Sequence, residues 1–210
     1  MNIKGTAVRA RLEFIRGGSG AAGLEATLAA LPPEDRRALE VALPTSWIPV
    51  ELVDRLDVEI AREGGGIAVA REYGGFSARR NLSRVYRLCV DQAGGDPQAL
   101  LQGLATLHSS FYDEGRMQAV ESEPGSCRVE IDFAGQASRF RCQVALGFTE
   151  EALRMLNVRA LQVREESCQT RGAPRCGFAV RWRAEVARDA ELAAISAPQP
   201  ETATGFAIAG

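Results

Sequence analysis

Several features that mark common catalytic classes are scarce in this chain of 210 residues. It has one histidine, His108, and no Gly-x-Ser-x-Gly segment, so neither a Ser-His-Asp nor a Cys-His centre is supported. Gly17–Gly20 lacks the Gly-Lys-Ser/Thr ending of a phosphate-binding loop, and no segment has a nicotinamide or flavin fingerprint. These absences predict a protein that binds a partner or ligand and is not an enzyme.

The chain also lacks a charge excess and a long apolar run. Lys and Arg total 25 against 27 Asp and Glu, which gives a net charge of -2 and no basic stripe that would favour nucleic acid. No stretch reaches the roughly 18 apolar residues of a membrane span, and the N-terminus lacks the pattern of a secretory signal. We therefore expect a cytoplasmic protein with no membrane span and no nucleic-acid partner.

The five cysteines are an odd number for a secreted disulfide framework. In a reducing compartment they are expected to be free thiols or metal ligands. Cys89 and Cys127 have no ligand-like neighbours and are predicted to be packing residues.

Hydrophobic spacing predicts helices in the first half of the chain and strands in the second. Ile3, Val8, Leu12 and Ile15 recur at helical spacing, and Pro33 and Pro97 suit first helical turns. The ranges predicted as helices after Pro33 are 49–62, 78–92, 97–107 and 140–156, and the ranges predicted as strands are 117–123, 127–133, 159–165 and 177–183. The expected fold class is α+β, with N-terminal helices followed by a small antiparallel sheet with packed helices.

The length fits one domain. We expect that domain to span residues 1–185 and a flexible tail to span residues 186–210, where Ala, Pro, Thr and Gly dominate.

A polar loop near the C-terminal end carries a cysteine at each end, Cys168 and Cys176. Two thiolates so placed could fold back onto one metal ion, and Glu165 and Cys142 could complete a tetrahedral set. The alternative is that Cys142 is a small core residue and Glu165 an exposed strand end.

The run from Val163 to Trp182 resembles the C-terminal signature of 4-vinyl reductase domains. The residues that carry the resemblance are Glu165, Cys168, Gly172, Pro174, Cys176 and Phe178. Those domains are related to the heme-nitric-oxide-binding and TRAPP-type tethering folds and form the sensory half of phenol-responsive transcription activators. The resemblance therefore implies the NO-signalling and Golgi-transport ligand-binding fold.

A longer pattern, up to Trp182, resembles an uncharacterised paralogous family abundant in myxobacteria. The shared segments are Lys4-Gly5, Leu31–Arg36, Ser46–Pro49, Phe76–Ala78 with Asn81-Leu82, and Tyr112–Arg116. This family has no assigned activity, and the chain carries no ATPase or DNA-binding region of the kind found in phenol-responsive activators.

The zinc ligands of the phenol sensors match Cys142, Glu165, Cys168 and Cys176 in kind and spacing. The resemblance thus implies one structural zinc with a filled coordination shell. The surroundings of His108 do not resemble the heme-ligating context of the nitric-oxide sensors.

The resulting hypothesis is a non-catalytic small-molecule sensor that contains structural zinc. Its ligand is expected to be apolar or phenolic and to bind in a cavity between the N-terminal helices and the sheet, and the chain is expected to form a homodimer. Aromatic residues that could line the cavity are Trp47, Phe76, Tyr86, Phe111 and Tyr112. The alternative is a dimeric protein-interaction scaffold that resembles TRAPP-type tethering subunits, and a reductase ranks last.

Overall fold

The structure is a computed structural model that describes residues 1–159 and 161–183. The predicted tail at residues 186–210 lies outside the described residues, so the tail and the domain limits remain predictions. No described helix is long and apolar enough to cross a membrane.

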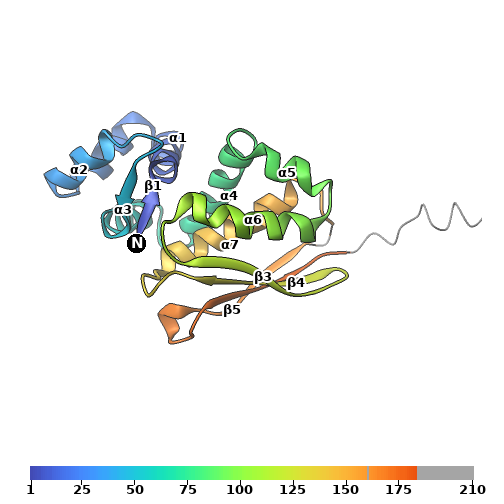
Figure 1. Ribbon diagram of the computed structural model, residues 1–210. Helices are drawn as coiled ribbons and strands as arrows, with labels where there is room; N and C mark the ends of the chain where they lie inside the picture. Colours follow the sequence, from blue (N-terminus) through green and yellow to red (C-terminus); the bar gives the residue numbers. More distant parts are fainter. Residues whose placement is uncertain (160, 184–210) are drawn as a thin grey trace, which may run out of the picture.

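The fold is α+β, as predicted, with helices before the main sheet (Figure 1). The N-terminal elements are β1 (Asn2–Lys4), α1 (Gly5–Ala29), α2 (Pro33–Glu40), β2 (Trp47–Pro49) and α3 (Val50–Glu63). The remaining helices are α4 (Ala68–Leu82), α5 (Arg87–Ala93), α6 (Pro97–Phe111) and α7 (Arg139–Arg154), with the short 3-10 turn η1 (Gln169–Arg171). The remaining strands are β3 (Arg116–Glu123), β4 (Ser126–Asp132), β5 (Gln162–Ser167) and β6 (Cys176–Arg181).

The main sheet is antiparallel throughout, with the strand order β3-β4-β6-β5. Alternate residues of β4, including Val129 and Ile131, are buried toward the helices α6 and α7. The opposite face carries charged side chains, among them Glu130, which pairs with Arg175 at 2.9 Å. One face of the sheet is therefore core and the other is polar, which is the usual division for an antiparallel sheet.

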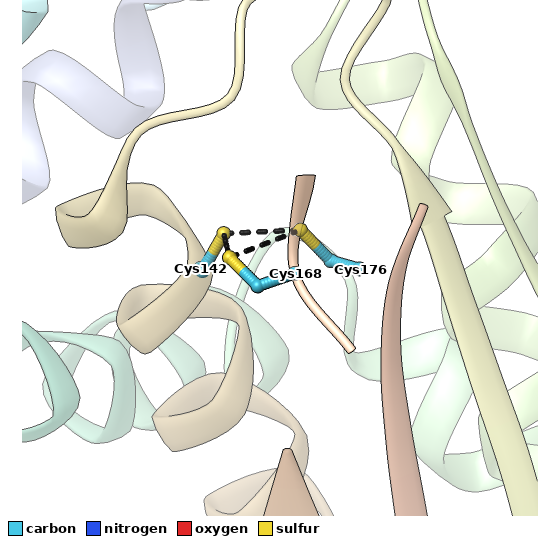
Figure 2. Close-up of side chains that lie close together, drawn as sticks. All are labelled: Cys142, Cys168 and Cys176. Atoms are coloured by element: carbon cyan, nitrogen blue, oxygen red, sulfur yellow. Dashed lines mark hydrogen bonds between the residues drawn. The ribbon is translucent and has the colours of Figure 1, made fainter. Parts of the chain in front are cut away.

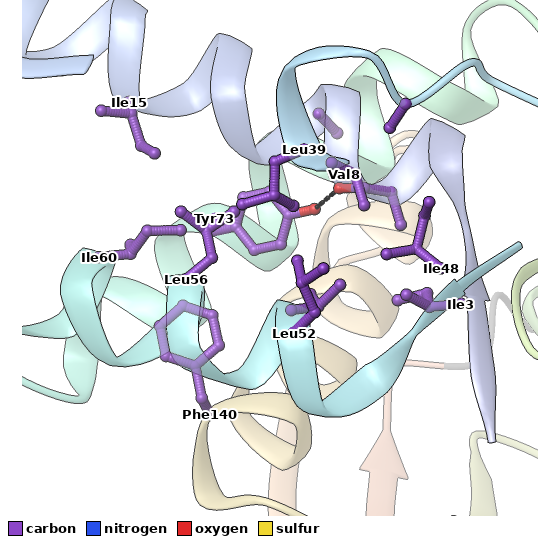
Figure 3. Packing of buried hydrophobic residues seen from close by; sticks show 14 of the residues in the cluster. Ile3, Val8, Ile15, Leu39, Ile48, Leu52, Leu56, Ile60, Tyr73 and Phe140 are labelled. Atoms are coloured by element: carbon purple, nitrogen blue, oxygen red, sulfur yellow. Dashed lines mark hydrogen bonds between the residues drawn. The ribbon is translucent and has the colours of Figure 1, made fainter. Parts of the chain in front are cut away.

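Buried apolar side chains form two clusters. The first joins α1, α2 and α3 to the small sheet β1–β2, and Figure 3 shows Tyr73 of α4 among these side chains and Phe140 of α7 below them. The second joins the main sheet to α6, α7 and the C-terminal half of α4. Because α4 and α7 contribute to both clusters, these two helices connect the N-terminal part of the fold to the sheet.

Two N-terminal predictions need correction. Ile3 belongs to strand β1 and pairs with Ile48, so the helix begins only at Gly5. A side chain at Gly5 would meet the carbonyl oxygen of Leu43 at 1.9 Å, which explains a glycine at this close approach. The expected helix-connecting turn at Gly17–Gly20 is instead a kink within α1 at Gly20, whose φ is 73°.

The single helix predicted for residues 78–92 is also wrong. Residues 83–86 separate α4 from α5, and α4 begins ten residues earlier, at Ala68. Gly74 lies within α4, and its small size lets α4 pack closely on α7. The other predicted elements match the structure within a few residues.

Candidate ligand cavity and thiol cluster

A cavity of about 90 Å³ lies where the two apolar clusters meet. Its walls come from α1, α4, α6 and α7, closed by β1, β3 and β4, and most of the lining atoms are apolar. The polar side chains in the wall are Arg11, Tyr73, Ser77, His108, Tyr112, Arg141 and Thr149. An enclosed apolar space with a few polar groups has the composition of a small-molecule site.

His108 carries a buried hydrogen-bonding atom without a partner in the wall of the cavity. It lies in the last turn of α6 and is 7 % exposed, and its Nε2 atom is buried without a hydrogen-bond partner. The imidazole stacks on the Tyr112 ring, with centroids 4.9 Å apart. Burial lowers the pKa of His108 to about 4, so the ring is neutral at physiological pH. A buried, unpartnered polar atom in a cavity wall is a candidate anchor for a ligand.

A buried ion pair forms a second part of the wall. Arg11 of α1 donates from Nε and Nη2 to the carboxylate of Asp57 on α3, at 2.5 and 2.9 Å. Burial alone would lower the pKa of Arg11, but the carboxylate of Asp57 raises it, while burial raises the pKa of Asp57 against the opposing charge of Arg11. The bidentate geometry is that of an ion pair, which lets both charges remain in the core.

Tyr73 extends this network from α4. Its hydroxyl donates to the carbonyl oxygen of Ala7 at 3.0 Å, the interaction drawn in Figure 3, and accepts from Arg11 at 3.2 Å. These bonds occupy the polar atoms of Arg11 and Tyr73, so neither is free to bind a ligand without breaking a contact.

Arg141 fixes the opposite wall. It lies on α7, is 1 % exposed, bonds to Asp54 at 2.5 Å and to the carbonyl oxygen of Gln136, and packs over the Phe133 ring. Sequence reasoning missed Arg11, Asp57 and Arg141, because an arginine inside an amphipathic pattern ordinarily reads as a surface residue.

The aromatic predictions for the cavity are partly right. Phe111 and Tyr112 line it, whereas Trp47, Phe76 and Tyr86 are outside the lining. Trp47 is 42 % exposed and carries Lys4 over its ring, and Phe76 packs on Phe14 in the N-terminal cluster.

The three thiols of Cys142, Cys168 and Cys176 converge at a second location (Figure 2). Cys142 comes from α7, Cys176 begins β6, and Cys168 lies directly between β5 and η1. The sulfur of Cys142 lies 3.1 Å from that of Cys176 and 3.5 Å from that of Cys168, and the third separation is 3.9 Å. All three side chains are at most 1 % exposed.

Glu165 lies beside this cluster, with its carboxylate directed to cationic groups. Its Oε1 accepts from Arg139 at 2.7 Å and from Arg171 at 2.8 Å, and its Oε2 accepts from Gln143 at 3.2 Å. Burial alone would raise the pKa of Glu165, but the hydrogen bond and charge of Arg139 lower it. The structure thus brings together the three predicted cysteines, while both oxygens of the predicted fourth ligand are used by other partners.

The thiols of Cys142 and Cys176 differ in their pKa values. The hydrogen bond between Cys142 and Cys176 lowers the pKa of Cys176 and raises that of Cys142, so Cys176 is the thiolate of the pair. Cys89 and Cys127 lie outside the cluster, in agreement with their predicted packing role.

Comparisons with known proteins identify the fold. No protein-family model matches the chain, and no curated protein matches it in sequence. Its structure is similar to an H-NOX protein from S. oneidensis in the Fe(II)NO ligation state, with a TM-score of 0.71, 15% identity and coverage of 86% of this chain and 99% of that one. It is also similar to the Fe(II) unliganded H-NOX protein from K. algicida, with a TM-score of 0.71, 12% identity and coverage of 88% and 98%.

A third similar structure is an oxygen complex of an oxygen-binding H-NOX domain related to soluble guanylate cyclases. Its TM-score is 0.65 at 17% identity, with coverage of 86% of this chain and 95% of that one. The fold is therefore that of H-NOX domains, which agrees with the nitric-oxide-sensor fold expected from the sequence.

The prediction of a structural zinc cofactor is wrong. The similar solved structures are heme nitric-oxide-binding domains described in Fe(II) states, and none of those named above is described with zinc. The geometry also differs from the predicted set of ligands. The Glu165 carboxylate bonds to Arg139 and Arg171, so three sulfur atoms converge where four ligands were expected.

Heme, the group that the fold implies, does not fit the residues of this chain as they stand. His108 could offer a neutral imidazole nitrogen, but the cavity beside it measures about 90 Å³. Sites for drug-sized ligands already occupy roughly 300–1,000 Å³, and a heme macrocycle needs a space of that order. Phe111, Tyr112 and Phe148 fill the space around His108, so the cavity suits a much smaller molecule.

Proposed function

We propose that the chain is a non-catalytic sensor module that binds one small, mainly apolar molecule in the cavity, with His108 as the polar anchor. The observation that carries this proposal is the buried Nε2 atom of His108, which lies in an apolar cavity wall without a partner. A buried polar group without a partner costs about 1–3 kcal/mol, and a ligand that bonds to it recovers part of that cost.

The size of the cavity limits the ligand to about one aromatic ring. A dry apolar cavity of about 150 Å³ holds benzene, and this cavity, at about 90 Å³, is smaller. Adjustment of the partly buried Leu107 and Phe111 would admit a ring of that size.

The chemistry of the anchor favours a hydroxyl group on the ligand. A neutral imidazole has one donor and one acceptor nitrogen, and a hydroxyl can satisfy either of them. A simple phenol combines such a group with one apolar ring. The resemblance to the 4-vinyl reductase domains of phenol sensors supports the same ligand class.

The protein-scaffold alternative has less support. The similar solved structures are H-NOX proteins, and none of those named above is described as a tethering subunit. Within the described residues, the large exposed apolar side chains are Val41, Leu43, Trp47, Val58, Ile67, Val85 and Leu88. A homodimer remains part of the sensor proposal, because a ligand that favours one association state would provide a signalling output.

A thermal-shift screen tests the function. Phenol, cresols, a short fatty acid and hemin are added separately to the wild type and to the variant His108→Leu, and light scattering follows the association state. A phenol should raise the unfolding temperature of the wild type, because a ligand at 100 times its Kd stabilises the native state by about 2.7 kcal/mol. The variant should lose most of that shift.

Two results would refute the proposal. One is the absence of any shift with single-ring compounds. The other is stoichiometric heme binding with a Soret band that disappears in His108→Leu, which would show that the cavity opens to hold the macrocycle.

A further inference from the structure

Thr149 is one of the polar side chains in the wall of the ligand cavity. It lies on α7, whereas His108 lies on α6, and only 2 % of the residue is exposed. Ala145, one turn earlier on α7, lines the cavity from the same face of the helix. Thr149 therefore borders the cavity from a different helix than His108 does, next to a small side chain.

The hydroxyl group of Thr149 lacks the bond that helical threonines often make. A threonine inside a helix can donate to the carbonyl oxygen four residues earlier. Thr27 does so with Gly23 at 2.8 Å, and Thr106 does so with Gln102 at 3.3 Å. Within residues 1–159 and 161–183, the Thr149 hydroxyl makes no hydrogen bond. A buried hydroxyl without a partner is unfavourable, and a polar group in the adjoining cavity would satisfy it.

Several other polar groups of the cavity wall are already engaged. The Ser77 hydroxyl accepts from an asparagine side chain at 3.1 Å, and Arg11 and Tyr73 belong to the buried network around the ion pair. Arg141 uses both terminal nitrogens of its guanidinium group. Thr149 thus offers a ligand a neutral hydrogen-bonding group, and no existing bond has to break for its use.

We propose that Thr149 is a specificity-determining residue of the cavity, which selects rings that carry a second hydrogen-bonding substituent besides the hydroxyl bound by His108. This inference rests on the sensor function proposed above and narrows its ligand class from simple phenols to dihydroxybenzenes. A threonine hydroxyl can donate or accept, and so can the hydroxyl of such a ligand. Because the two anchors come from different helices, the spacing of the substituents on the ring decides which isomer bonds to both.

Anaerobic calorimetric titrations of the full chain with phenol, catechol, resorcinol and hydroquinone test the assignment. The three dihydroxybenzenes hold their second hydroxyl at different distances from the first. At least one of them should bind the wild type about 3- to 10-fold more tightly than phenol, the gain expected from one additional buried hydrogen bond. Thr149→Val nearly keeps the shape of the side chain but removes the hydroxyl, so it should bind phenol and that isomer with nearly equal affinity.

Further variants make the test specific to this hydroxyl. Thr149→Ser keeps the hydroxyl and should keep the preference, and Thr149→Ala takes the place of Thr149→Val if circular dichroism shows that the valine variant is unfolded. Thr106→Val removes an exposed hydroxyl of α6 outside the cavity lining and should behave as the wild type does. Tyr112→Phe removes another hydroxyl from the wall. A preference that disappears in Tyr112→Phe but persists in Thr149→Val would overturn the assignment.

The outcomes separate this inference from the function on which it rests. If phenol binds the wild type as tightly as all three dihydroxybenzenes do, the role of Thr149 is wrong and the sensor function stands. If the folded wild type binds none of the four compounds, both are wrong.

Discussion

His108 is the residue on which the proposed function depends most. It is the one histidine of the sequence, and its pKa is lowered by burial from 6.5 to about 4. The sequence showed the residue but not its role, because a lone histidine near a helix end is ordinarily a surface residue. The role that we propose for His108 depends on the cavity beside it, which α1, α4, α6 and α7 form together.

The buried imidazole makes stability depend on pH. Between pH 6.5 and about 4 the unfolded chain binds a proton at His108 that the folded chain does not, so the free energy of unfolding falls as the pH falls through this window. A shift of this size corresponds to at most about 3 kcal/mol. We predict that, as the pH is lowered from 6.5 to 4, the free energy of unfolding falls less in His108→Gln than in the wild type.

Urea unfolding at a series of pH values measures the difference. The carboxylates titrate in both proteins, so the difference between the two curves isolates the imidazole. Curves that run parallel over this window would mean that His108 is solvated in the folded protein.

Loss of one partner of the ion pair between Arg11 and Asp57 should lower the free energy of unfolding far more than loss of one partner of an ion pair on the surface. Arg11→Met leaves the carboxylate of Asp57 buried without its partner, and we predict a loss of about 3–5 kcal/mol in the free energy of unfolding. Replacing both residues, as in Arg11→Met with Asp57→Leu, should recover much of the loss, since no unpaired charge then remains.

Arg87→Met is the matched control, because Arg87 pairs with Asp91 on α5 and both side chains are exposed. It should change the free energy of unfolding by at most a few tenths of a kcal/mol. Equal losses for Arg11→Met and Arg87→Met in denaturant titrations would contradict the buried-pair account.

At the scale of elements, the helices α4 and α7 are packed closely against each other. A side chain at Gly147 of α7 would meet the carbonyl oxygen of Arg71 at 2.0 Å, and one at Gly74 of α4 would meet that of Val144 at 2.3 Å. The two helices pack backbone to backbone through these glycines. Both helices also supply walls of the cavity, so their spacing sets its width.

We predict that Gly147→Ala lowers the free energy of unfolding by roughly 3 kcal/mol, because the methyl group forces the helices apart. Gly17→Ala is the control, since nothing lies within 4 Å of the added methyl group in α1. It should stabilise the protein by up to about 1 kcal/mol. A chemical denaturation series measures both, and a neutral Gly147→Ala would disprove the close contact.

Local sequence patterns predicted most elements but not those that depend on distant partners. Pro33 and Pro97 predicted correct helix starts, and alternating spacing predicted the strands β3 and β4. Ile3 has helical spacing but pairs with Ile48 across 45 residues of sequence, and no local signal reports such a pairing. The close packing of Gly74 on α7 has no local signal either, since Val144 lies 70 residues away in the sequence.

The same difference between local patterns and distant partners explains which features of the site could be predicted. The loop from Cys168 to Cys176 and the spacing to Cys142 indicated that three thiols converge, which they do. The position of the Glu165 carboxylate could not be foreseen, because Arg139 and Arg171 were each ordinary charged residues in the sequence. The zinc prediction is contradicted by the similar solved structures, which are H-NOX proteins in Fe(II) states.

At the scale of the whole molecule, the chain has the fold of H-NOX domains and contains a cavity between its helices and the main sheet. In this chain the cavity is small, largely apolar and bordered by a neutral imidazole. The central claim is that this cavity holds a small molecule with one ring and one hydroxyl group.

Calorimetric titration of phenol into the wild type and into Ala145→Leu tests that claim most directly. Ala145 lines the cavity from α7, and leucine at this position would fill the space, whereas Ala22→Leu on the exposed surface of α1 leaves it open. The account predicts saturable binding of one phenol per chain to the wild type and to Ala22→Leu, and none to a folded Ala145→Leu. Absence of binding to the wild type, or equal binding by all three proteins, would contradict it.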